Sequence, residues 1–132
     1  MPDPQWHLSE TYKSLITLSV EALKLLALVN GGAAVAILAY LGSLTSHSAA
    51  VPLPHIRWAL VCYGLGVFLT VMAFLTAYLT QLRLYGEELS RVSGGPFRQR
   101  HQILLAIGCS CAVSAALLFL VGCCLAALAL GQ

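Results

Sequence analysis

Three long apolar stretches constrain this chain more than any other feature. They run from about residue 25 to 44, 56 to 80 and 103 to 130, and each reaches the roughly 20 residues that a helix needs to cross a bilayer. Only 9% of the residues are charged and 59% are hydrophobic, yet a domain of this size buries only about two-thirds of its unfolded surface. The composition therefore excludes a soluble enzyme. We expect an all-α membrane protein with three transmembrane helices in one domain over residues 1–132, surrounded by the lipid bilayer.

The distribution of basic residues predicts the orientation of the chain. The amino-terminal segment and the connection between the second and third spans lie on the same side, and only Arg57 lies on the other. Because cytoplasmic loops carry the excess of Lys and Arg, the sequence predicts a cytoplasmic amino terminus and, in a bacterium, a periplasmic carboxyl terminus. The basic residues on the cytoplasmic side are Lys13, Lys24, Arg83, Arg91, Arg98 and Arg100.

The first two helices are expected to continue into the cytoplasm beyond their spans. Residues 9–24 predict an amphipathic helix with Ser9 as its cap, upright rather than flat in the interface, and residues 81–92 predict a matching extension of the second helix. The polar stripe of the first extension comprises Glu10, Lys13, Ser14, Thr17, Glu21 and Lys24. We expect the extensions to pack on each other or on neighbouring subunits as a cytoplasmic collar. Its candidate residues are Glu21, Lys24, Leu82, Arg83, Tyr85, Glu87, Leu89 and Arg91.

Within the first span, Asn30 precedes two glycines, Gly31 and Gly32. An amide is costly among lipid tails unless it finds partners, and glycines let another backbone approach closely. The favoured interpretation is a tight helix contact held by one interhelical hydrogen bond; the alternative is a pore constriction lined by Asn30 from several subunits. Further candidate pore or packing residues in the other spans are Thr70, Ser110 and Ser114.

Several functional classes lack the residues that they need. The spans carry no charged residue or His at mid-membrane depth, which disfavours proton relays, voltage sensors and carriers of charged substrates. The five cysteines fall inside apolar stretches and the four histidines are scattered, so we expect no catalytic residues, no metal site and no cofactor. No basic block is dense enough to bind nucleic acid. We expect a protein that is not an enzyme.

One segment carries a resemblance to a known group of proteins. The sequence LVNGGAAVA, which is Leu28 to Ala36, lies within the stretch Ser14 to Gly42. This stretch resembles the first helix of small uncharacterised bacterial membrane proteins that recur in chromosomes and mobile elements. The resemblance implies a bacterial inner-membrane protein and implies no activity. Three-span phage holins are of similar size, but their typical topology and charged carboxyl tail differ from those predicted here.

Two functional hypotheses from different classes follow. The leading hypothesis is a homo-oligomeric inner-membrane protein that forms a pore or perturbs the membrane, in a mobile-element or defence setting, because one three-helix unit has too few helices to enclose a path. The alternative is a non-conducting accessory or immunity-type protein that binds another membrane protein. A small-solute carrier acting as a dimer is a third, weaker hypothesis.

Overall fold

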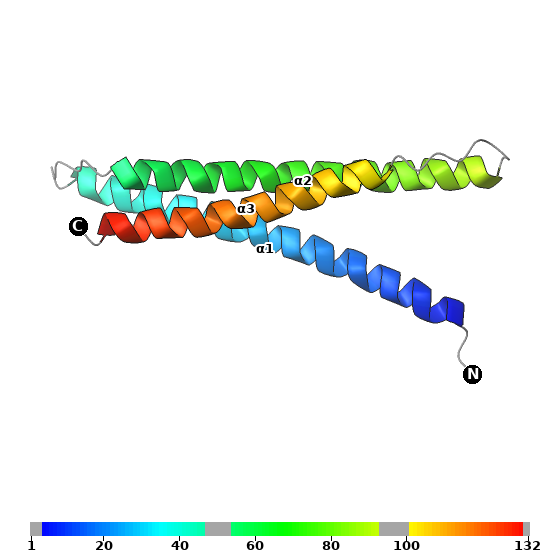
Figure 1. Ribbon diagram of the computed structural model, residues 1–132. Coiled ribbons are helices and arrows are strands. Elements are labelled where there is room, and N and C mark those ends of the chain that lie inside the picture. Colours follow the sequence, from blue (N-terminus) through cyan, green and yellow to red (C-terminus); the bar gives the residue numbers. More distant parts are fainter. Residues whose placement is uncertain (1–3, 47–53, 93–100, 131–132) are drawn as a thin grey trace.

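The computed structural model describes residues 4–46, 54–92 and 101–130, and all of these residues are helical. The helices are α1 (Pro4–Ser46), α2 (Pro54–Val92) and α3 (His101–Leu130), shown in Figure 1. Each contains a segment long and apolar enough to cross a membrane, namely Ser9–Leu44, His55–Glu87 and Gln102–Ala129. The prediction of an all-α fold with three membrane-spanning helices is confirmed, and the chain is a multi-pass membrane protein.

Prolines begin two of the three helices. Pro4 opens α1 and Pro54 opens α2, in a position that suits proline because the first helical residue has no intrahelical use for a backbone N–H. The expected cap at Ser9 is wrong: Ser9 lies inside α1, and its hydroxyl donates a 2.9 Å hydrogen bond to the carbonyl oxygen of Trp6. The second helix ends at Val92, directly before the sequence Ser-Gly-Gly-Pro that breaks helices.

The three helices pack unequally. α2 and α3 run antiparallel and lie side by side, whereas α1 crosses this pair and its amino-terminal half leans away from it (Figure 1). α1 makes its contacts mainly with α2 and touches α3 least. The arrangement is therefore a tight helix pair with a third helix that is attached over only part of its length.

Small residues every seven positions explain the close approach of α2 and α3. α3 presents Gly108, Ala115, Gly122 and Ala129 in an unbroken heptad series, and the last three of these are buried. A Cβ atom added at Gly122 would come within 2.7 Å of the Tyr63 ring, and one at Gly108 within 2.8 Å of the Thr76 hydroxyl. Small residues on the contact face let membrane helices pack backbone to backbone, which is where such helices gain most of their attraction.

A single chain leaves much of its apolar surface uncovered. Its accessible surface is 9392 Å², compared with about 6,700 Å² for a compact protein of 14.0 kDa. Among the described side chains of α1, only Asn30 is fully buried. Lipid or further protein must therefore cover most of α1.

Candidate functional site

The contact between α1 and α2 centres on the side chain of Asn30. This side chain has no exposed surface, and its amide lies directly on Gly66, so closely that any Cβ atom at Gly66 would overlap it. The amide nitrogen donates a 3.0 Å hydrogen bond to the Leu26 carbonyl of the preceding turn. The amide oxygen has no hydrogen-bond partner.

This geometry differs from the expected interhelical hydrogen bond. The donor of Asn30 stays within α1, and its acceptor faces a glycine that offers only Cα–H groups. Such Cα–H···O contacts recur where helices meet, and each is worth about 0.5–1 kcal/mol. A buried acceptor without a strong donor costs about 1–3 kcal/mol. Asn30 therefore specifies where α1 meets α2 more than it strengthens the contact.

The glycines next to Asn30 contribute less than their sequence suggested. A Cβ atom at Gly31 would only just touch Val67 of α2, at 4.0 Å, and one at Gly32 would meet nothing within 4 Å. The glycine that allows the close approach is Gly66, which the pattern around Asn30 does not reveal because it lies on the opposing helix.

The buried threonines of α2 satisfy their hydroxyls within their own helix. Thr70 has no exposed surface and donates a 2.8 Å hydrogen bond to the carbonyl of Gly66. The Thr80 hydroxyl donates a 2.7 Å hydrogen bond to the backbone carbonyl of Thr76. The Thr76 hydroxyl donates a 2.9 Å hydrogen bond to the backbone carbonyl of Ala73. This arrangement is common for hydroxyls in membrane helices, and it leaves no hydroxyl proton of these residues for a passing solute.

The candidate residues of α3 lie apart from this contact. Ser110 and Ser114 are exposed on α3, away from the heptad series that packs on α2. The structure thus brings Asn30 and Thr70 to the α1–α2 contact and leaves the two serines on the outer surface of the subunit.

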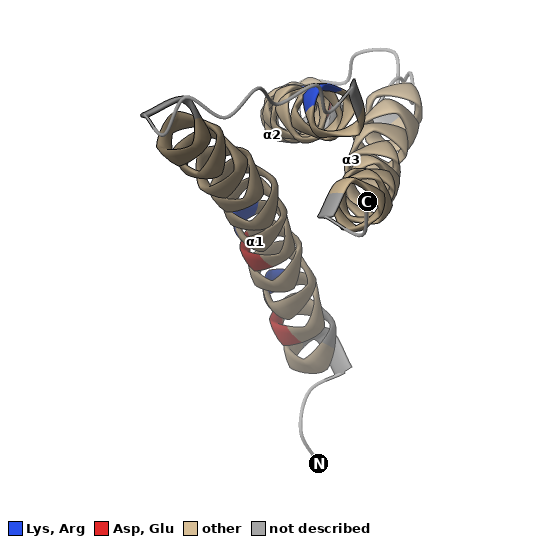
Figure 2. Ribbon diagram, turned by 90° about the vertical axis from the view of Figure 1, so that its left-hand side faces the viewer, with Lys and Arg blue, Asp and Glu red and all other residues tan. Residues whose placement is uncertain are grey.

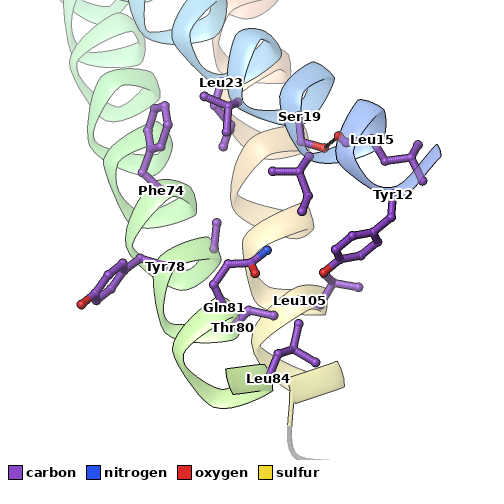
Figure 3. A pocket seen from close by; sticks show the side chains of 13 residues that line it. Tyr12, Leu15, Ser19, Leu23, Phe74, Tyr78, Thr80, Gln81, Leu84 and Leu105 are labelled. Carbon is purple, nitrogen blue, oxygen red and sulfur yellow. Dashed lines mark hydrogen bonds between the residues drawn. The ribbon is translucent and has the colours of Figure 1, made fainter. Parts of the chain in front are cut away.

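A cleft opens where α1 leans away from the other helices. It has a volume of about 610 Å³, and α1 forms one wall while α2 and α3 form the other (Figure 3). No charged residue lines it. A smaller cleft of about 260 Å³ adjoins it, and the two share Ser19, Leu23, Ala77, Thr80 and Leu105. The residues of the larger cleft are Tyr12, Leu15, Ile16, Ser19, Val20, Leu23, Phe74, Ala77, Tyr78, Thr80, Gln81, Leu84 and Leu105.

The two walls of the cleft continue the register of the α1–α2 contact. Because the helices are antiparallel and Asn30 meets Gly66, each step back along α1 matches a step forward along α2. This register places Ser19 opposite Ala77 and Tyr12 opposite Leu84, and all four residues line the cleft. The separated faces therefore match each other in position as well as in apolar character.

The collar residues are exposed on both extensions. Tyr85 is 70% exposed and Leu89 is 59% exposed; Leu82, Arg83, Glu21 and Lys24 are also exposed, while Glu87 is half-buried. The side chain of Arg91 lies outside the described part of the structure. Because α1 leans away, the two extensions lie apart within one subunit (Figure 1).

The polar stripe of α1 carries two ion pairs. Lys13 lies 2.9 Å from Glu10, and Lys24 lies 2.8 Å from Glu21. Figure 2 shows the acidic and basic positions alternating along α1. At 100° per residue this stripe lies nearly opposite Asn30, so it faces away from α2.

The His, Cys, Asp and Glu residues in the described part of the chain are spread over the three helices. Within residues 4–46, 54–92 and 101–130, no three His, Cys, Asp or Glu side chains gather as a metal site would require. The cysteines are free thiols, and Cys123 accepts a 3.4 Å hydrogen bond from the Tyr63 hydroxyl.

Comparison of the chain with protein-family models, with curated proteins and with solved structures gives no match.

Proposed function

We propose that this chain is the subunit of a homo-oligomeric assembly in a bacterial inner membrane, and that the assembly forms a pore or perturbs the bilayer. Its amino terminus lies in the cytoplasm and its carboxyl terminus in the periplasm. The assembly acts without chemical catalysis and without a cofactor, and a mobile genetic element or a defence system is a suitable setting. The bacterial location follows the resemblance of Leu28 to Ala36.

The observation that carries this proposal is the outward polar stripe of α1. Glu21 and Lys24 have side chains 62% and 60% exposed, on a helix segment that is long and apolar enough to cross a membrane. Ionisable groups in membrane helices almost always face a bundle interior or a water-filled cavity. A lone subunit provides neither for this stripe, whereas an oligomer provides one or the other.

In this proposal Asn30 packs α1 on α2, which is the interpretation that the sequence favoured over a pore lining. Its side chain is buried inside the subunit against Gly66, which favours a packing role over a pore lining. Replacing Asn30 by Leu is therefore expected to leave ion flux unchanged wherever the assembly is preserved. Flux lost from an intact assembly would instead place Asn30 in the conducting path.

The decisive experiment combines native mass with flux. The complex is extracted gently from its own membrane, weighed, and then reconstituted into vesicles loaded with ions. A single species at an integer multiple of 14.0 kDa, together with ion or dye release from the vesicles, supports the proposal. A mass that requires a second polypeptide, with tight vesicles, contradicts it.

A second candidate is a non-conducting accessory or immunity-type protein that binds another membrane protein. The observation that favours it is the exposed apolar seam of α2, formed by Leu82, Tyr85 and Leu89. Exposed apolar side chains spaced three and four residues apart on one helix face are typical of a surface that binds another helix. Crosslinking from a cysteine introduced at Leu89 separates the two candidates, because the accessory function predicts a different polypeptide as the product and the homo-oligomer predicts the chain itself.

A further inference from the structure

The outward stripe of α1 reaches the level of the apolar part of α2. Asn30 meets Gly66, and Lys24 and Glu21 follow at about 9 and 14 Å along α1 at 1.5 Å per residue. The apolar part of α2 continues about 21 Å past Gly66 in the same direction, to Thr80. Both charged residues thus lie alongside the apolar part of α2, and not in an extension below it as the sequence predicted for residues 9–24.

The four charged residues form a repeated pattern. The pair Glu10–Lys13 recurs 11 residues later as Glu21–Lys24. Eleven residues make just over three full turns, so the second pair lies within about 20° of the first around the helix. Glutamate and lysine of each pair are about 60° apart. The stripe therefore has one acidic edge and one basic edge, with Thr17 midway along it.

Such a stripe is complementary to a second copy of itself. Consider two parallel α1 helices related by a rotation axis that runs parallel to them, with their stripes facing each other. The right-hand edge of one stripe then lies against the left-hand edge of the other. The acidic edge of one α1 then lies against the basic edge of the next, at the level of both pairs. The same holds for every neighbour in a larger ring, because each contact repeats the same rotation.

We propose that α1 helices from neighbouring copies of this chain meet in parallel along the stripe formed by Glu10, Lys13, Thr17, Glu21 and Lys24. This contact rests on the homo-oligomer of the proposed function, and it places the rotation axis of that oligomer beside the stripes and parallel to α1. The occupant is a second copy because the ion pairs within α1 leave their side chains 48–70% exposed, and the edges of a second stripe offer charges of opposite sign in the correct order. Each glutamate then contacts a lysine of its own helix and one of its neighbour.

Cysteine crosslinking tests the contact directly. In a variant whose five native cysteines are replaced by Ala, single cysteines are placed at Thr17, at Leu18 and at Ile16, and the membranes are oxidised. Leu18 is 64% exposed but lies off the stripe, and Ile16 lines the cleft. We expect a disulfide-linked dimer at Thr17, several-fold more abundant than at either control position. Equal crosslinking at Thr17 and Leu18 would indicate random collision and overturn the proposal.

Charge exchange tests the chemistry of the contact. In the Thr17→Cys background, Lys24→Glu makes one level of the stripe wholly acidic, and Glu21→Lys makes it wholly basic. Each variant alone should lose the crosslink, and coexpression of the two should restore it between the two differently tagged chains. Failure to restore it between chains that both reach the membrane contradicts the proposal. Where either chain fails to insert, the position scan with unaltered charges decides.

The outcomes separate this inference from the proposed function. An oligomer of intact native mass without a preferential Thr17 crosslink leaves the homo-oligomer standing and overturns the stripe as its contact. A monomer in the membrane overturns both.

Discussion

The close contact of Asn30 with Gly66 leads us to predict that adding one methyl group, by Gly66→Ala, destabilises the packing of α1 on α2. Replacing Gly66 by Ala introduces a Cβ atom onto the Asn30 amide, closer than real Cβ contacts allow. The amide cannot turn aside freely, because its nitrogen is bonded to the Leu26 carbonyl and the side chain has no exposed surface. Either the amide leaves its position or α1 moves off α2. Overpacking of this kind costs about 1–3 kcal/mol.

Gly64 provides a matched control two residues away on the same helix. A Cβ atom at Gly64 meets nothing within 4 Å, so Gly64→Ala should gain only the helix propensity of alanine, about 1 kcal/mol. Since Gly66→Ala gains the same propensity, the difference between the two variants isolates the clash. We expect Gly66→Ala to be less stable than Gly64→Ala by about 1–3 kcal/mol.

The assay is reversible unfolding of the purified protein in mixed micelles, followed by helix content. Truncating the opposing side chain should remove the clash, so the double variant Asn30→Ala with Gly66→Ala should recover most of the difference, with a coupling energy of about 0.5–3 kcal/mol. Equal stabilities for the Gly64 and Gly66 variants would refute the reasoning, and so would the absence of coupling with Asn30.

Two further predictions concern the other contacts. Gly122→Ala drives a Cβ atom into the buried ring of Tyr63, so it should lower the free energy of unfolding by about 1–3 kcal/mol. Adding Tyr63→Leu should restore most of this loss. An unchanged free energy of unfolding in Gly122→Ala would show that α2 and α3 are less closely packed. Cysteines at Ser19 and Ala77 are matched in register across the cleft, and in a background without native cysteines they should form a disulfide under oxidation whenever α1 closes on α2. A pair offset by two residues on α1 serves as the control, and equal yields from both pairs would show that the register is not kept.

The three spans are visible in the sequence because the bilayer imposes a length and a polarity that few other structures share. The break after Val92 is equally local, since Gly and Pro act on their own backbone. Ser9 misled because it is one of several residues that could cap a helix, and the proline at position 4 precedes it and already fits the first helical turn.

The sequence does not show which residues of one helix pack on which residues of another. The sequence marks Asn30 as costly, but which glycine lies beneath it depends on the rotation and register of two helices, and these follow from packing along the whole contact. Gly31 and Gly32 are glycines just as Gly66 is, but a Cβ atom added at either would meet no atom closer than 4.0 Å. The heptad of small residues in α3 was readable, but a helix that is apolar all round gives no periodic hydrophobicity to draw attention to it.

α1 is a single helix of 43 residues, unbroken through Gly31 and Gly32, and Asn30 is its one fully buried described side chain. That point divides it into arms of about 39 Å toward the amino terminus and about 24 Å toward Ser46. When α1 tilts as a rigid body about Asn30, its two ends move in opposite directions. The displacement of the Ser46 end is about three-fifths of that of the amino-terminal end. A force applied at the amino-terminal end of α1 therefore displaces the opposite end of the helix, near Ser46.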